Sequence, residues 1–368
     1  MGTFEPHLTV RLAGHECSSF HVCGVLGLVM AATLAAALAA SHGLSLVVEG
    51  AIVALAVLTF FALAVATKVL TGREALIYYH HEIAVLLVAA GTAAVLGAPV
   101  LRHLDATALG LGAFLACGRV GCLSVGCCHG RPAAGRGIHY GRAHIAHGLP
   151  AHLAGVPLVP VQAIEASAVI AITTTGAAAV ALGAAPGAGL VIYVTGYGLL
   201  RFGLELLRGD EGRRFAAGLS EAQWTSLAVL GLVTGAGALG ALPGAGTAEL
   251  VLVAACLALL VPLALLEGLG PRGRARSPAH VREIAEALER AVAPAGAAPP
   301  VATTSQGLCL SCGESGGVAH YTLSHAPPSV GAVAADVVRR LRHPRAPSRL
   351  VSGRGPVLHL LVERDDRA

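Results

Sequence analysis

Long apolar runs with almost no charge constrain this chain more than any other feature. Between Val22 and Ala66 the only formally charged side chain is that of Glu49. A helix needs about 20 apolar residues to cross a bilayer, so this stretch is long enough for two spans. The runs are continuous and do not alternate with polar residues, which favours helices over a membrane β-barrel.

Similar runs recur along most of the chain. Of its 368 residues 55% are hydrophobic and only 12% are charged, whereas about 25% of the residues of a soluble protein carry charge. The first run begins too late for a signal peptide and has no basic region before it, so we expect a retained anchor. We predict an all-α fold, a polytopic membrane bundle of about 7–8 transmembrane helices, near residues 22–40, 46–66, 83–101, 105–125, 158–185, 186–207, 219–242 and 247–266.

The chain changes character after Gly268. A basic stretch follows, and Ser277 is placed to cap a helix over about 279–292. Strands over 320–324 and 357–362 around a helix near 330–342 predict a small soluble α/β appendage. We therefore expect a transmembrane domain over 1–268, a basic and Pro/Ala-rich linker with a short helix over 269–302, and an appendage over 303–368.

We predict that a membrane helix opens into a water-accessible cavity at the stretch Gly118–Pro132. It follows an apolar run and carries Arg119 and Arg131 among several glycines. An arginine at that depth is costly unless it faces a partner or a ligand, and glycines let a backbone approach closely. These residues predict a bound anion.

A polar stripe lies at the end of the sixth run. Tyr197, Arg201, Glu205 and Arg208 are spaced four, four and three residues apart, so they share one face of a helix. Together with Arg119, this face could clamp an anion. The alternative is a structural ion pair between Arg201 and Glu205 near the interface.

Two further polar groups open apolar runs. The stretch Tyr78–Glu82 contains His80 and His81, and a histidine can act as a general base because its pKa is near neutrality. The alternative is an interfacial belt of aromatic and histidine side chains. Gln162 and Glu165 open the fifth run, where such residues alone would only mark the start of a helix.

The nine cysteines are an odd number and predict no disulfide framework. A candidate thiol cluster joins Cys117, Cys122, Cys127, Cys128 and His129. It could be a thiol-redox or metal site, although its spacing is not that of a zinc Cys-x-x-Cys pair, and cysteines in membrane helices are often small apolar fillers. Cys309 and Cys312 have the Cys-x-x-Cys spacing, which supplies half a zinc site or a local disulfide. We assign no metal, no soluble cofactor and no nucleic-acid motif.

The motifs and their order resemble the prolipoprotein diacylglyceryl transferase family over roughly residues 5–243. Pro160, Gln162 and Glu165 look like its Pro-x-Gln-x-x-Glu element, and the polar stripe followed by Gly218–Ser226 is similar to its closing motif. Asp105 matches an aspartate frequent in the family. The family signature is Gly-Arg-x-Gly-Asn-Phe-x-Asn-Gly-Glu-x-x-Gly-Arg. This chain matches it, with the same spacing, at Gly118, Arg119, Gly121, Gly126, Gly130 and Arg131.

Several positions depart from the family pattern. Cys122 and Val125 replace the two asparagines of the signature, and Cys127 replaces its glutamate. A His-Gly-Gly element becomes His80-His81-Glu82, and a Trp-Tyr-Gly element falls on Val22-Cys23-Gly24. The eighth apolar run and the tail after Gly268 are additions to the family pattern. The resemblance therefore indicates a divergent member.

The resemblance implies transfer of a diacylglyceryl group from phosphatidylglycerol to the thiol of a lipobox cysteine in a prolipoprotein, which releases glycerol phosphate. Such a reaction needs a base to form the thiolate and cations to hold the phosphate. By resemblance, His80 or His81 is the base, and Arg119 and Arg201 bind the phosphate. The implied substrate-binding residues are Gly121, Gly130, Arg131, Gln162, Glu165, Tyr197, Glu205 and Arg208.

The resemblance also implies a place in the bacterial cytoplasmic membrane, with the catalytic loop on its outer side. The positive charges gather on the side of that loop, which by the positive-inside rule argues for the cytoplasmic side. Arginines that bind substrate, however, should not be counted when the positive-inside rule is applied. Two other functions stay open, a thiol-redox or metal-binding protein on the same scaffold and a non-catalytic binder of phospholipid or lipoprotein.

Overall fold

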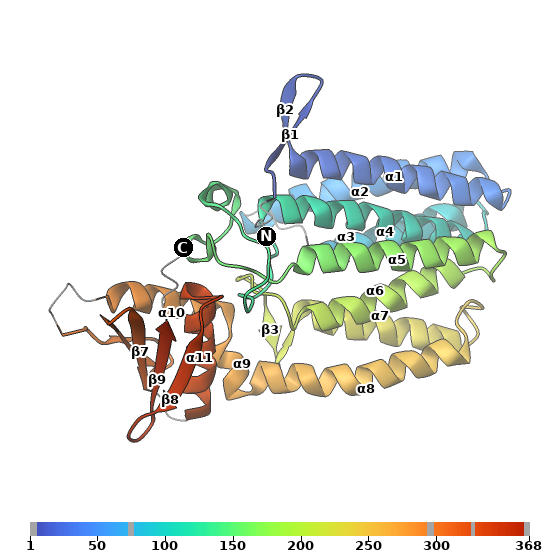
Figure 1. Cartoon of the computed structure of the whole chain (residues 1–368). Helices are drawn as coiled ribbons and strands as arrows, with labels where there is room; N and C mark the ends of the chain where they lie inside the picture. The colour runs from blue at the N-terminus through green and yellow to red at the C-terminus, as the bar shows by residue number, and fades with distance from the viewer. Residues whose placement is uncertain (1–5, 73–76, 293–297, 325–327, 364–368) are drawn as a thin grey trace.

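The computed structural model describes residues 6–72, 77–292, 298–324 and 328–363. Its larger part is a bundle of long helices that run side by side (Figure 1). The bundle consists of α1 (Ser19–Ser41), α2 (Leu46–Thr71), α3 (Tyr78–Val95), α4 (Val100–Val125), α5 (Val161–Ala181), α6 (Ala188–Leu204), α7 (Glu221–Ala238) and α8 (Thr247–Leu269).

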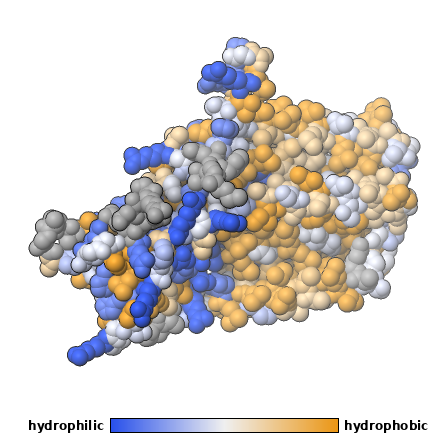
Figure 2. Space-filling model, in the orientation of Figure 1, coloured by the Kyte–Doolittle hydropathy of each residue, from blue (hydrophilic) through white to orange (hydrophobic). Residues whose placement is uncertain are grey.

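The composition of these helices fits a bilayer. Among the described residues, α1, α2, α4, α5 and α8 are long and apolar enough to cross a membrane, whereas α6 is shorter. The surface of the bundle is hydrophobic over most of its length, and hydrophilic residues gather at one end (Figure 2). Exposed apolar side chains such as Val69, Leu87 and Val95 contribute to this surface. The prediction of a polytopic helical membrane bundle is confirmed.

The third span differs from the one predicted over residues 83–101. Helix α3 already begins at Tyr78 and ends at Val95, and α4 begins at Val100. Gly97 has a φ of +64°, and Pro99 precedes the first turn of α4. A glycine in the left-handed region and a proline are ordinary helix terminators, so this short segment divides what looked like one apolar run.

The bundle core depends on small residues. A Cβ atom at Gly112 of α4 would lie 2.1 Å from Oγ1 of Thr173 on α5 and 2.8 Å from the ring of Tyr193 on α6. Only glycine permits this approach, as expected where helices pack in lipid. The contact brings the middle of α4 close to α5 and α6.

One end of the bundle, which we call the loop end, carries most of the polar chain (Figure 1). The loop over residues 126–160 lies there, with two short 3-10 helices, η1 (Arg142–His147) and η2 (Ala151–Leu153). Two small hairpins also lie there. They are β1 (Thr9–Leu12) with β2 (His15–Ser18), and β3 (Phe215–Ala216) with β4 (Leu219–Ser220).

The tail after α8 folds into three helices and an antiparallel sheet of order β5-β6-β7-β9-β8. The predicted helices and strands of this α/β region are present, and the Ser277 hydroxyl caps α10 by accepting from the backbone N–H of His280. Strands β5, β6 and β8 were not predicted. Strand β5 has only two residues, and the Ser, Gly and Arg residues of β6 and β8 obscure the alternation. The tail elements are α9 (Pro271–Ala275), α10 (Pro278–Arg290), α11 (Pro328–Arg342), β5 (Ala302–Thr303), β6 (Cys309–Ser315), β7 (Val318–Ser324), β8 (Ser348–Ser352) and β9 (Val357–Glu363).

The local disulfide considered for Cys309 and Cys312 is wrong, because both thiols are free. The two residues lie on the single strand β6 and are three positions apart. Successive side chains of a strand point to opposite faces, so these two thiols point away from each other. The same geometry prevents them from sharing one metal ion.

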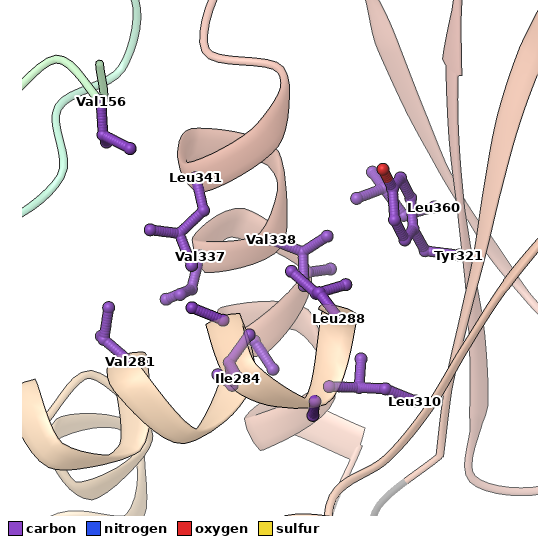
Figure 3. Packing of buried hydrophobic residues seen from close by; sticks show 14 of the residues in the cluster. Val156, Val281, Ile284, Leu288, Leu310, Tyr321, Val337, Val338, Leu341 and Leu360 are labelled. Carbon is purple, nitrogen blue, oxygen red and sulfur yellow. The ribbon is translucent and has the colours of Figure 1, made fainter. Parts of the chain in front are cut away.

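The tail packs onto the loop after α4. One hydrophobic core joins Val156 of the loop to Val281 and Ile284 of α10 and to Leu341 of α11 (Figure 3). At its rim Arg282 pairs with Glu211 at 3.1 Å. The tail therefore lies on the same side of the bundle as the loop over residues 126–160. The division of the chain at residues 268 and 302 stays a prediction.

Candidate functional site

A buried ion pair joins three helices at the loop end. Nε of Arg119, near the end of α4, lies 2.9 Å from Oε2 of Glu165, in the first turns of α5. Tyr197 of α6 donates a 3.1 Å hydrogen bond from its hydroxyl to Oε1 of the same carboxylate. All three residues are buried. Since a buried charge is costly without partners, each charge here is held by the other.

A second cluster forms where α6 ends. Nη2 of Arg201 lies 2.6 Å from Oε1 of Glu205, and Nη1 of Arg213 lies 3.0 Å from Oε2 of Glu205. Arg208 lies 3.8 Å from Glu205 and binds Asp210 through two hydrogen bonds of 2.7 and 2.6 Å. Burial raises the pKa of Glu205, but the three guanidinium groups outweigh it and hold that pKa below its usual range. Glu205 is therefore ionised.

The two clusters have one more cation than they have anions. Four arginines, at 119, 201, 208 and 213, face three carboxylates, at 165, 205 and 210. Nη1 of Arg201 is buried and has no hydrogen-bond partner among the described residues. Charge-assisted hydrogen bonds from arginine are strong and suit phosphate, so the arrangement can hold one further anion.

Tyrosines fill the space beside these ion pairs. Tyr193 and Tyr197, four residues apart on α6, stack with their ring centroids 6.0 Å apart. Tyr78 hydrogen-bonds to Tyr193, and Tyr79 bonds to Oγ of Ser226 on α7 at 2.7 Å. We did not predict Tyr193, although its spacing from Tyr197 placed it on the same helix face.

The two histidines of α3 have different surroundings. Nε2 of His80 lies 3.3 Å from Oε1 of Glu221 at the start of α7, and the side chain is 54% exposed. His81 is buried against the ring of Phe60, with Nδ1 lying 3.0 Å from the carbonyl oxygen of Ile77. The neighbouring Glu82 is buried too, and its Oε2 has no hydrogen-bond partner within the described ranges.

A family model described as prolipoprotein diacylglyceryl transferase matches residues 8–238, which is more than half of the chain. The chain belongs to the prolipoprotein diacylglyceryl transferase family. The match contains all of α1 to α7 and the two arginine clusters, whereas α8 and the tail lie outside it. No curated protein matches the chain. The protein is therefore a multi-pass membrane protein of a transferase family that acts in lipoprotein biosynthesis.

The two glycines that we associated with a diacylglyceryl substrate lie close to other parts of the protein. A Cβ at Gly121 would lie 3.2 Å from Cβ of Cys23 on α1, and a Cβ at Gly130 would lie 2.3 Å from the carbonyl oxygen of Val159. Helix and loop packing therefore explain both residues. A contact of either glycine with a diacylglyceryl headgroup stays a prediction.

Two other residues of the predicted diacylglyceryl transferase site support the loop. Gln162 is buried and donates a 2.7 Å hydrogen bond from Nε2 to the carbonyl oxygen of Cys127. Arg131 lies 3.6 Å from Glu267 at the end of α8, and its Nε donates to the carbonyl oxygen of Arg208 at 3.4 Å. Arg131 therefore lies beside the arginine clusters and is bound to a carboxylate outside them.

The candidate thiol cluster of this diacylglyceryl transferase family member is smaller than predicted. The sulfur atoms of Cys122, Cys127 and Cys128 lie within 4.8 Å of one another. Cys117 instead directs its thiol to the sulfur of Met30, at 3.6 Å, and His129 bonds through Nδ1 to the carbonyl oxygen of Gly130. The structure therefore brings three thiols together and leaves Cys117 and His129 out.

Proposed function

We propose that this protein transfers a diacylglyceryl group from phosphatidylglycerol to the thiol of a lipobox cysteine in a prolipoprotein. The observation that supports this most is the pair of buried arginines, Arg119 and Arg201. Each has a carboxylate on one side, at 2.9 and 2.6 Å, and the clusters they belong to carry excess positive charge. This is the environment that a phosphate ester needs in a partly dry site.

The chemistry is a displacement at carbon. The acceptor thiolate attacks the glyceryl carbon that carries the phosphate ester, and a C–S bond forms as the C–O bond breaks. The electron pair leaves on an oxygen of glycerol phosphate. Arg119 and Arg201 stabilise the charge that develops there, and removing one such donor commonly costs about 10²–10³ in rate.

We assign the base to His80. Its Nε2 faces the carboxylate of Glu221 at 3.3 Å, so the Nε2–H is directed to that oxygen and the lone pair of Nδ1 is free to accept a proton. A carboxylate that orients a histidine in this way is a recurring feature of general-base catalysis. Its exposure gives His80 access to an acceptor peptide, whereas His81 is buried beside Phe60.

The membrane geometry fits a lipid donor and a peptide acceptor. The clusters lie where α4 and α6 end. The surface of the bundle is apolar, and hydrophilic residues gather at one end of the molecule (Figure 2). We place this end on the outer side of the bacterial cytoplasmic membrane. The positive charge there does not argue against that side, because Arg119, Arg201 and Arg208 are buried in the site.

The test is a transfer assay in vesicles that contain labelled phosphatidylglycerol, with a lipobox peptide as acceptor. Wild-type protein should give a thioether product, Arg201→Ala should lose it, and a serine version of the peptide should give none. Arg136→Ala is the matched control, because Arg136 is exposed on the loop over residues 126–160 and belongs to neither arginine cluster. Absence of product with folded wild type that binds phosphatidylglycerol would contradict this function.

A further inference from the structure

Three cysteine thiols meet where α4 ends. Cys122 lies in the last turn of α4, and Cys127 and Cys128 follow the helix terminus at Gly126. Their sulfur atoms lie within 4.8 Å of one another, and all three thiols are free. Cys128 has a φ of +53°, a conformation that is unfavourable for a residue with a Cβ. The turn gathers two adjacent thiols and one from the helix into a single cluster.

The surrounding structure holds this cluster in place. The carbonyl oxygen of Cys127 accepts a 2.7 Å hydrogen bond from Gln162 of α5. The next residues are fixed by a 3.0 Å bond from the backbone N–H of Gly209 to the carbonyl oxygen of His129. The loop is thus bound to α5 on one side and to the chain after α6 on the other.

The spacing of the sulfur atoms suits a metal ion. A zinc–sulfur distance is about 2.3 Å, so the sulfur ligands of one ion lie about 4 Å apart. The present spacing needs a contraction of less than about 1 Å to reach that value. Soft thiolate ligands select ions such as Zn²⁺ and Cu⁺ over hard cations.

We propose that Cys122, Cys127 and Cys128 bind one thiol-preferring metal ion of the zinc class and leave its fourth tetrahedral position open. Metal sites that act on substrates commonly use three protein ligands and keep the fourth position for water or substrate. The proposed occupant of that position is the acceptor thiol. This second part rests on the proposed function, whereas the metal site itself does not.

The location of the cluster fits this role. Cys122 follows Arg119 by three residues on α4, so the two side chains share one face of the helix. Cys128 also interacts electrostatically with Arg208 and Arg119, so the cluster lies beside the arginines of the proposed phosphate site. A thiol bound here lies about one helical turn from the proposed phosphate site.

The proposed step is balanced without an oxidant or reductant. The acceptor S–H gives its proton to the histidine base, and the resulting thiolate binds the metal through its sulfur. The same sulfur then forms the C–S bond as the C–O bond to glycerol phosphate breaks. The thioether is a weaker ligand than the thiolate, so the product leaves and the oxidation state of the ion does not change.

The test uses full-length protein in detergent, reduced and metal-free, titrated with Co²⁺ in the absence of oxygen. We expect one Co²⁺ per chain with thiolate charge-transfer absorption, which Zn²⁺ abolishes. Cys122→Ser and Cys128→Ser should each lower the affinity for Co²⁺ by at least about 100-fold. Cys309→Ser is the matched control and should bind as wild type does, since its thiol lies on β6 of the tail.

A second measurement separates loss of a ligand from misfolding. In folded wild type, Zn²⁺ should protect Cys122, Cys127 and Cys128 from alkylation and leave Cys309 reactive, as read by mass spectrometry of peptides. If folded, reduced protein shows no thiolate charge-transfer absorption with Co²⁺ and no protection of the three cysteines by Zn²⁺, the metal site is overturned. A disulfide within the cluster in oxidised protein, together with no Co²⁺ binding after reduction, would overturn it in favour of a redox pair.

The acceptor role is tested with a lipobox peptide and no lipid donor. The cysteine peptide should raise the charge-transfer absorption by about one third, for four thiolates in place of three, and the serine peptide should not. Equal responses to both peptides would overturn the acceptor role and leave the metal site. A protein that binds Co²⁺ and the peptide thiol but makes no thioether would contradict the proposed transfer alone.

Discussion

Nη1 of Arg340, on α11 of the tail, donates a 3.0 Å hydrogen bond to the carbonyl oxygen of Pro132, just after α4. The bond joins the tail to the loop over residues 126–160, which contains Cys127 and Cys128. A second arginine of the tail, Arg345, donates from Nε to the carbonyl oxygen of Gly135 at 3.3 Å. The tail therefore contributes to the position of the loop, although it lies outside the region that the family model matches.

Weakening the tail core should loosen this loop. Ile284 is fully buried in the core that the tail shares with the loop, so Ile284→Ala should cost about 2–5 kcal/mol of local stability. We expect faster amide hydrogen exchange over residues 138–158 in this variant. Arg349→Ala, at an exposed position of β8, is the control. Unchanged exchange in the loop of a variant whose tail has unfolded would show that the loop holds its position without the tail.

Breaking the Arg119–Glu165 pair should affect stability and activity separately. Removal of one partner leaves a buried charge alone, so Glu165→Leu should lower the free energy of unfolding by about 3–5 kcal/mol. Replacing both residues, as in Arg119→Met with Glu165→Leu, should restore much of that stability and leave transfer at least about 10²-fold slower than wild type. Thermal unfolding and the vesicle assay measure the two effects. If the double variant is active, Arg119 does not bind the phosphate.

The two histidines should respond differently to the same substitution. His80→Gln should slow transfer by about 10²–10⁴-fold with little change in unfolding temperature, as loss of a general base does. Glu221→Gln should have a smaller effect on the rate, because it removes only the partner of His80. His81→Gln should mainly lower the unfolding temperature, since its buried ring packs on Phe60. A large loss of rate in His81→Gln, with little effect of His80→Gln on the rate, would assign the base to His81.

Acidification should weaken the contact between loop and tail. The pKa of His152, on η2, lies below its usual value of 6.5, because burial and the nearby His129 and Arg282 disfavour its charged form more than Glu286 and Glu289 favour it. The unfolded chain therefore binds a proton before the folded chain does, and stability falls as the pH drops below about 6.5. Above that pH both states are neutral at this position and the contribution is constant.

Limited proteolysis of the tail at about pH 7.5 and about pH 5.5 tests this dependence. Cleavage should be faster at the lower pH in wild type, and His152→Leu should reduce that difference. His147→Leu, an exposed residue of η1, should keep it. A pH dependence that is identical in wild type and His152→Leu would assign the effect to another group.

Much of the bundle was predictable because its signals are local. A membrane span needs only a continuous apolar run, and the pair of Arg201 and Glu205 follows from a spacing of four residues on a helix. The third span was misplaced because the apolar run continues through the segment that ends at Pro99, where the backbone breaks the helix. Local composition did not show that break as clearly as the backbone does.

By itself, the sequence determined that this chain spans a membrane as helices, that it resembles a diacylglyceryl transferase and which arginines are costly to bury. Only the tertiary structure decided that Arg119 pairs with Glu165, that three of the clustered cysteines meet, and that the tail packs on the loop after α4. The physical reason is the range of the interactions. Helix formation and membrane insertion depend on neighbours within a few turns, whereas these contacts join segments far apart in the chain and depend on how small residues let the helices approach.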